Sequence, residues 1–218
     1  MITDLEWQSA AALLAEGVET LQQPISEQQQ QVMLNYLKLL DKWNKAYNLT
    51  SINDWRGMVI KHLLDSIAVN PWIKGPSVLD VGTGAGIPGF PLAILNPEKL
   101  FTLLDTNGKK TRFMIQAKAE LGIRNVTVVQ ARIERFQPET PYDQIICRAY
   151  SSLENFVKQV HHIKAPERAV ELLAMKGQLP EQELADVTGL PFNVEVLSVE
   201  SLVVPFLDEQ RHLIRMMI

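Results

Sequence analysis

Cysteine is almost absent from this sequence. Its single residue, Cys147, excludes an internal disulfide, and no group of Cys and His has the spacing of zinc ligands. Long apolar runs are missing as well: none approaches the ~18 residues of a membrane span, and the start has no basic, apolar leader. We therefore expect a cytoplasmic protein with no metal and no membrane contact.

An excess of positive charge is also missing, because the formal net charge is −4. That total argues mildly against indiscriminate binding to nucleic acid. The distribution is uneven, however: residues 109–148 carry eight Lys and Arg against four Asp and Glu, a local surplus of +4. Solvated helix faces explain such a segment as readily as a nucleic-acid surface does, so charge alone leaves both interpretations open.

Aromatic residues make up only 7% of the chain, but a hydrophobic content of 46% is ample for the core of one large domain. The N-terminal part predicts helices. A helical pattern over residues 4–16 is expected to end at Gly17. Ser26 opens a capping-box sequence, Ser-Glu-Gln-Gln, ahead of an amphipathic stretch, and a third helix is expected over residues 54–69. We assign residues 1–74 to a helical extension packed on the core.

The sequence changes character after Gly75-Pro76. Short apolar segments of β type alternate with helical patterns, which is typical of a parallel sheet covered by helices on both faces. The last two segments are separated only by a turn, which favours an antiparallel pair at the sheet edge. We predict a doubly wound, Rossmann-like α/β fold over residues 75–218. The expected strands cover residues 77–81, 100–105, 126–130, 144–149, 169–175, 192–204 and 211–218.

Residues 78–89 read Val-Leu-Asp-Val-Gly-Thr-Gly-Ala-Gly-Ile-Pro-Gly, a glycine-rich loop between a strand and a helix. Its last six residues spell GxGxxG, and an acid ends the next strand, as in a dinucleotide fingerprint. Asp80 favours another cofactor, because a carboxylate at the mouth of the loop would repel a pyrophosphate. It would attract the ammonium and sulfonium of S-adenosylmethionine (SAM) by about 4 kcal/mol at ~4 Å before desolvation. SAM, bound by Asp80, Gly82 and Gly84, is thus preferred over a nicotinamide cofactor.

Two later segments complete the predicted cofactor site. Asp105, at the end of the second strand, is placed to accept hydrogen bonds from both ribose hydroxyls, although it could instead cap the next helix. After the third strand, Ile133 is expected to lie against adenine. Glu134 or the local backbone would meet the polar edge of adenine, and the alternative is that Glu134 only begins a helix.

The end of the fourth strand, Cys147-Arg148, bears on the methyl acceptor. Enzymes that methylate exocyclic amines of bases typically carry Asn/Asp-Pro-Pro-aromatic here, and this motif is absent from the chain. Cys147 lies within an apolar strand, where a core residue is expected rather than a nucleophile. No general base stands out, which suits N7 of guanine, because this nitrogen has a lone pair and no proton to lose. Arg148 would orient the base or the donor, or form only a structural ion pair.

Ordered motifs over roughly residues 30–218 resemble the RsmG/GidB family. They include Lys-Ala-Tyr-Asn-Leu-Thr-Ser-Ile at residues 45–52, His-Leu-Leu-Asp-Ser at 62–66, the glycine loop and Glu-Gln-Arg-His-Leu at 209–213. The resemblance implies the class I SAM-dependent methyltransferase fold and methylation of N7 of a guanine, guanine 527, in 16S ribosomal RNA. The 16S rRNA is expected within the small ribosomal subunit or an assembly intermediate, with naked RNA open as the alternative substrate, and we expect the chain to act as a monomer.

The resemblance also implies roles for individual side chains. The implied donor contacts are Gly82, Ile87, Ile133, Glu134 and Arg148. The basic residues implied to face RNA or the target base are Lys109, Arg132, Lys176 and Arg211. We take Arg148, Lys176 and Arg211 as the catalytic group and Lys109 and Arg132 as substrate contacts; solvated surface positions are the alternative. His62 and Asp65 are expected to pin the helical extension to the domain.

Two positions depart from the family pattern. Members commonly carry serine where Cys147 stands, and Thr106-Asn107 replaces the usual Ser-Leu after the second strand. Two other functions also stay open: a methyltransferase for another RNA or a small molecule, and a non-catalytic RNA-binding module. The intact glycine run after Asp80 argues against a module that has lost its cofactor.

Overall fold

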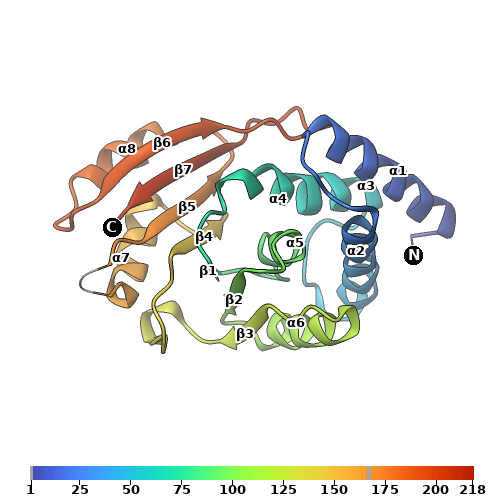
Figure 1. Ribbon diagram of the computed structural model, residues 1–218, viewed down its shortest axis with the longest axis horizontal. Coiled ribbons are helices and arrows are strands. Elements are labelled where there is room, and N and C mark those ends of the chain that lie inside the picture. Colours follow the sequence, from blue (N-terminus) through green and yellow to red (C-terminus); the bar gives the residue numbers. More distant parts are fainter. Residues whose placement is uncertain (1, 166–167) are drawn as a thin grey trace.

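The computed structural model describes residues 2–165 and 168–218, and a seven-stranded sheet forms its centre (Figure 1). The strand order is β3-β2-β1-β4-β5-β7-β6. Strands β1 to β5 are parallel, whereas β7 is antiparallel to both β5 and β6. The strands are β1 (Ser77–Val81), β2 (Leu100–Asp105), β3 (Val126–Gln130), β4 (Gln144–Arg148), β5 (Glu171–Lys176), β6 (Glu195–Ser201) and β7 (His212–Met217).

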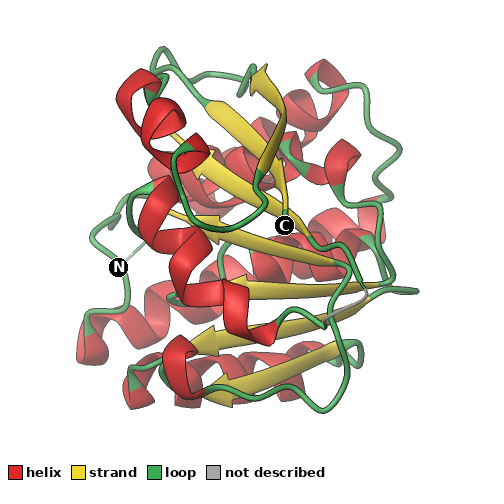
Figure 2. Ribbon diagram, turned by 90° about the vertical axis from the view of Figure 1, so that its left-hand side faces the viewer, coloured by secondary structure: helices red, strands yellow, loops and turns green. Residues whose placement is uncertain are grey.

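Helices cover both faces of the sheet (Figures 1 and 2). One face carries the helices that precede β3, and the other carries α7 and α8. Adjacent residues of β1 enter opposite cores, Val78 the first and Leu79 the second, as a strand buried on both faces requires. The helices are α1 (Asp4–Thr20), α2 (Glu27–Tyr47), α3 (Trp55–Met58), η1 (Val59–Leu64), α4 (Asp65–Ala68), η2 (Asn70–Trp72), α5 (Gly89–Leu95), α6 (Gly108–Leu121), η3 (Ile133–Arg135), α7 (Leu153–Val160), η4 (His161–Ile163) and α8 (Glu181–Thr188).

The N-terminal helices follow the predicted pattern with one correction. The capping box at Ser26 is confirmed: the Gln29 amide donates to Ser26 Oγ at 3.2 Å, and the Ser26 amide donates to Gln29 Oε1 at 3.0 Å. The expected helix end at Gly17 is wrong, because α1 continues to Thr20. Gly17 is buried against Leu64, whose side chain would lie 2.6 Å from any Cβ at this position. The glycine therefore allows close helix packing rather than ending the helix.

The third predicted helix exists, but a π-helical turn interrupts it. Asp54 caps its start, where Oδ1 accepts from the Gly57 amide at 2.7 Å. Within η1 the hydrogen bonds reach back five residues, and the Asp65 amide donates to the Ile60 carbonyl. This turn has no signal in the apolar periodicity that predicted the helix.

The predicted strands agree closely with the structure. The bounds of β1, β2 and β3 are those expected, and the antiparallel pairing of the last two strands is confirmed, although both are shorter than expected. In the described ranges, no helix has the length and apolar character that crossing a lipid bilayer would require. The carboxyl ends of β1, β4 and β5 meet at one edge of the sheet, together with the start of β7. In open α/β sheets this edge is where ligands bind.

Candidate active site

The glycine loop after β1 is held by buried hydrogen bonds. The amides of Gly82 and Thr83 donate to the Leu104 carbonyl at 2.9 and 3.2 Å. Asp80 Oδ2 accepts from the Thr83 hydroxyl at 2.6 Å and from the Gly89 amide at 2.9 Å. These bonds join the beginning and the end of the loop, so its backbone is fixed before any ligand arrives.

Asp80 does not lie at the mouth of the loop, as the sequence argument expected. Its side chain is fully buried beneath the loop, because alternate residues of β1 point into the sheet's two cores rather than outward. Burial raises the pKa of Asp80 to about 7. Oδ1 has no hydrogen-bond partner within the described ranges. The expected position of Asp80 is therefore corrected, and its role in attracting a cationic donor stays a prediction.

Asp105 also serves the loop. Its Oδ2 accepts from the Gly84 amide at 2.9 Å, and its Oδ1 accepts from the Asn107 amide at 2.8 Å. The N-cap of α6 is Asn107 instead, whose Oδ1 accepts from the Lys109 amide at 2.9 Å. The departure from the family pattern at Asn107 thus provides a helix cap. Each carboxylate oxygen of Asp105 keeps acceptor capacity for a ribose hydroxyl.

A cavity of about 560 Å³ opens at the carboxyl edge of the sheet. The glycine loop forms one wall through Gly82, Gly84 and Ile87. The same cavity is also lined by the three residues predicted to be catalytic, which come from the end of β4, the end of β5 and the segment before β7. These are Arg148, Lys176 and Arg211.

A smaller cavity of about 130 Å³ lies on the other side of Gly82. It is lined by the remaining residues predicted to bind the cofactor, apart from the buried Asp80, and by one of the predicted substrate contacts. Gly82 lines both cavities, and the ring of Tyr150 rests against it, so closely that a Cβ on Gly82 would meet the ring at 2.5 Å. The predicted residues at this cavity are Asp105, Arg132, Ile133 and Glu134.

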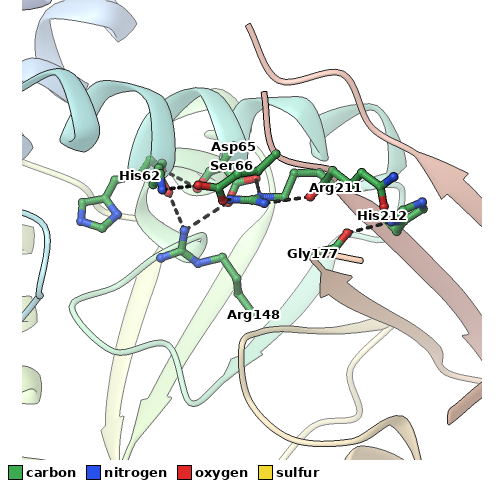
Figure 3. Close-up of polar contacts among 10 residues, drawn as sticks. His62, Asp65, Ser66, Arg148, Gly177, Arg211 and His212 are labelled. Atoms are coloured by element: carbon green, nitrogen blue, oxygen red, sulfur yellow. Dashed lines mark hydrogen bonds and ion pairs between the residues drawn. The ribbon is translucent and has the colours of Figure 1, made fainter. Parts of the chain in front are cut away.

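Figure 3 shows the partners of two of the predicted catalytic residues, Arg148 and Arg211. Arg148 Nη1 donates to the Lys61 carbonyl at 2.6 Å and pairs with Asp65 Oδ2 at 3.3 Å. Arg211 pairs with Asp65 through Nε at 3.2 Å and with Glu209 through Nη2. Its Nη1 donates to the Gln210 carbonyl.

Lys176 is anchored to the loop that follows β4. Its ammonium donates to the Ser151 carbonyl at 2.7 Å and pairs with Glu183 Oε2 at 2.8 Å. The same Glu183 oxygen accepts from the Leu153 amide, so the lysine helps to hold the segment that carries Tyr150.

The helical extension contributes directly to the large cavity. Thr50, His62 and Asp65 line it, and Tyr36 of α2 donates its hydroxyl hydrogen to the Ala85 carbonyl of the glycine loop at 2.9 Å. Burial lowers the pKa of His62 to about 3, so its imidazole is neutral at physiological pH. The sequence predicted only that His62 and Asp65 pin the helical extension to the domain, and neither was predicted to lie at the cavity.

Lys109 lies outside both cavities. It is exposed near the start of α6, whereas the following residue, Lys110, lines the large cavity beside Gly84. Adjacent helical residues point about 100° apart, so only one of a lysine pair can face the loop. The helical phase of α6 was the signal that could have identified Lys110 in the sequence.

Cys147 is a core residue, as expected. It lies in β4 among the residues that face α7, and burial raises the pKa of its thiol well above the usual range. A thiolate nucleophile is therefore not available at this position.

The two cavities fit the chemistry of SAM. Gly84 has φ near +66°, and a Cβ there would find only Lys110 Nζ at 3.8 Å, so the loop leaves room against its backbone. The apolar Ile133 and the acidic Asp105 and Glu134 at the small cavity suit a nucleoside. The basic residues that line the large cavity suit the carboxylate of the methionine part.

Comparisons with known proteins agree with this description. The GidB family, described as rRNA small subunit methyltransferase G, matches residues 29–214. The ribosomal RNA small subunit methyltransferase G of Marinobacter nauticus is 49% identical over 201 residues, which are 92% of each chain. The protein of the same name from Aliivibrio fischeri is 50% identical over 190 residues, covering 87% of this chain and 89% of the relative.

Solved structures support the fold. A magnesium protoporphyrin IX methyltransferase from Synechocystis, solved with bound SAM, matches with a TM-score of 0.58 at 17% identity, covering 89% of this chain and 99% of the other. A SAM-dependent methyltransferase from Aquifex aeolicus matches with a TM-score of 0.55 at 18% identity, covering 81% and 97%. At such identities the likeness establishes the architecture alone. Together with the match over residues 29–214, it leads to one conclusion: the chain belongs to the GidB family of rRNA small subunit methyltransferase G.

Proposed function

We propose that the large cavity is where this chain, a SAM-dependent methyltransferase of the 16S rRNA guanine-N7 family, holds its donor against a guanine of small-subunit rRNA. One observation carries this proposal: the glycine loop and three basic residues from distant parts of the chain line a single cavity at the carboxyl edge of the sheet. No other arrangement of the described side chains combines these features.

The reaction needs positioning more than acid–base catalysis. SAM, when bound, supplies an electrophilic methyl group on a sulfonium. The lone pair of guanine N7 forms the new carbon–nitrogen bond while the methyl–sulfur bond breaks, and its electrons stay on sulfur. The positive charge passes from sulfur to the base, so no proton has to move and the net charge of the site is unchanged. Approach and alignment of the two reactants then decide the rate.

The residues around the cavities receive roles that follow from this requirement. Gly82 and Gly84 give the donor access to the loop backbone, and Ile87 closes the wall beside them. Asp105, Ile133 and Glu134 hold the adenosine part in the small cavity, with Asp80 bracing the loop from below. Arg148 orients the donor or the base within the large cavity.

The remaining basic residues act on the RNA side. Lys176 and Arg211 fix the rim of the large cavity, and the exposed Arg132 and Lys109 contact the RNA backbone. We further propose that the enzyme is monomeric and cytoplasmic. We also propose that it acts on the small subunit or an assembly intermediate, because its net charge of −4 does not favour indiscriminate binding to free RNA. Residues 1–74 are proposed to be an extension that completes the site of the domain formed by residues 75–218.

The test is methyl transfer from labelled SAM to small subunits that lack the modification, with the product mapped by cleavage at N7-methylguanine. One labelled guanine is expected, and none in subunits that already carry the methyl group. Transfer to the subunits at another position would refute the proposed acceptor. If SAM binds but no RNA or subunit is labelled, the proposed donor site is supported and the proposed methylation of RNA is refuted.

A further inference from the structure

A buried carboxylate lies between the two arginines that line the large cavity (Figure 3). Asp65 is 3% exposed and belongs to α4. Its Oδ2 pairs with Arg148 at the end of β4, and its Oδ1 pairs with Arg211 before β7, at 3.3 and 3.2 Å. A single negative charge therefore serves two positive ones, in a place where an unpaired charge would be costly.

The π-helical turn adds a second acceptor for Arg148. In an α-helix the Lys61 carbonyl would accept from the Asp65 amide, but that amide donates to Ile60 instead. The Lys61 carbonyl thus does not receive the α-helical hydrogen bond from the Asp65 amide, and Arg148 Nη1 donates to it at 2.6 Å. A π-turn within an α-helix is uncommon and is often found at functional sites.

These two acceptors bind only part of the Arg148 guanidinium. Both bind the same nitrogen, Nη1, and in residues 2–165 and 168–218 no hydrogen bond involves its Nε or Nη2. Arg211 differs, because its Nε, Nη1 and Nη2 all have protein partners. Arg148 therefore keeps donors for a ligand in the cavity that it lines, whereas Arg211 holds the segment before β7 against α4.

We propose that Asp65 and the Lys61 carbonyl are the positioning groups that aim Arg148 at the bound donor and base. The carboxylate and the carbonyl fix one side of the guanidinium and turn its free side toward the cavity. Asp65 and Glu209 together carry two negative charges against the three positive charges of Arg148, Arg211 and Lys61, which leaves a surplus of one positive charge for an anionic ligand group. The helical extension is thus part of the active site. This inference rests on the proposed function, since it requires Arg148 to act on the ligand.

The experiment is a double-mutant cycle on Asp65 and Arg148. Donor affinity is measured by calorimetry, and kcat and KM are measured on unmodified small subunits. Hydrogen bonds to charged groups contribute ~1.5–3 kcal/mol, so Arg148→Ala should lower kcat/KM or donor affinity by about 10- to 100-fold. Asp65→Asn should lower the same parameter by about tenfold. The double variant should resemble Arg148→Ala within about twofold, because no Arg148 guanidinium is left for Asp65 to position.

Asp143→Asn provides the matched control. This partly buried aspartate accepts from the amide and hydroxyl of Ser77 and pairs with Arg168, at the opposite edge of the sheet from the cavity. It should lower the thermal midpoint without changing donor affinity or kcat. Should Asp65→Asn fail to fold, Asp65→Glu keeps the charge but displaces the carboxylate, and the same loss of kcat/KM is expected.

The outcomes separate this inference from the proposed function. Arg148→Ala with unchanged kinetics and donor affinity would overturn both the role of Arg148 and the positioning by Asp65. If Arg148→Ala is impaired but Asp65→Asn keeps wild-type kinetics and donor affinity, only the positioning by Asp65 is overturned. Losses that multiply in the double variant would also overturn it, because independent structural damage adds in free energy.

Discussion

Two glycines with the same backbone conformation should respond differently to alanine. Gly84 and Gly122 both have φ of +66°, and both would be strained by a side chain. No atom lies within 4 Å of a Cβ on Gly122, which follows α6. A Cβ on Gly84 would meet only Lys110 Nζ, at 3.8 Å, but it would stand in the wall of the large cavity. We predict that Gly84→Ala lowers donor affinity by at least about tenfold and that Gly122→Ala leaves it intact.

The size of both effects follows from the geometry. The left-handed conformation costs about 1–2 kcal/mol for a residue with a Cβ. Both variants should therefore lose a similar stability, which corresponds to a thermal midpoint lowered by roughly 2–8 °C for a chain of this length. Only at Gly84 does the added methyl group compete with the donor for space. A loss of at least about 1.4 kcal/mol, or tenfold in affinity, is expected there.

Calorimetry with SAM and thermal unfolding of the two variants form the assay. Gly84→Ala with donor affinity within twofold of the parent protein would refute the placement of the donor on this loop. Equal losses of affinity in both variants would show that strain, not occupied space, is responsible. Gly82→Ala extends the series: its Cβ would meet the Tyr150 ring at 2.5 Å, so it should lose more stability than either.

Three further predictions concern charge and reactivity. The folded pKa of Asp80, about 7, lies above its usual 3.8, so this group's contribution to stability is lost as pH rises from about 4 to about 7. Asparagine at position 80 does not titrate, so the free energy of unfolding of Asp80→Asn, minus that of the parent protein, should rise by a few kcal/mol between pH 4 and 8. If urea denaturation gives the same pH dependence of this free energy in both proteins, the prediction is contradicted. Cys147, being buried with a raised thiol pKa, should react with Ellman's reagent only on unfolding, and Cys147→Ser should keep methyl transfer; rapid labelling of the folded protein would count against it. Lys109→Ala should weaken subunit binding at low salt and reduce the log–log salt slope by about one, whereas Lys158→Ala on α7 should not; equal slopes would remove Lys109 from the RNA surface.

Local patterns in the sequence determined most of the architecture. Strands β1, β2 and β3 were predicted to the residue, because their short apolar runs contrast sharply with the helical patterns between them. The capping box at Ser26 and the antiparallel end of the sheet were equally local signals. The glycine loop indicated its own position at a strand-to-helix junction, and with it the class of cofactor.

Tertiary packing decided the rest. Gly17 lies within a helix rather than at its end, and it is a glycine because the side chain of Leu64, far along the chain, packs directly against it. Asp80 lies beneath its loop, a matter of which face of β1 each residue takes once the sheet is covered on both sides. Asp65 joins arginines that are 83 and 146 residues away, and only the sheet order brings β4 and β7 to α4. The sequence could list the chemical groups of the site, but contacts over such separations depend on the folded chain, because nothing in the local spacing of residues encodes them.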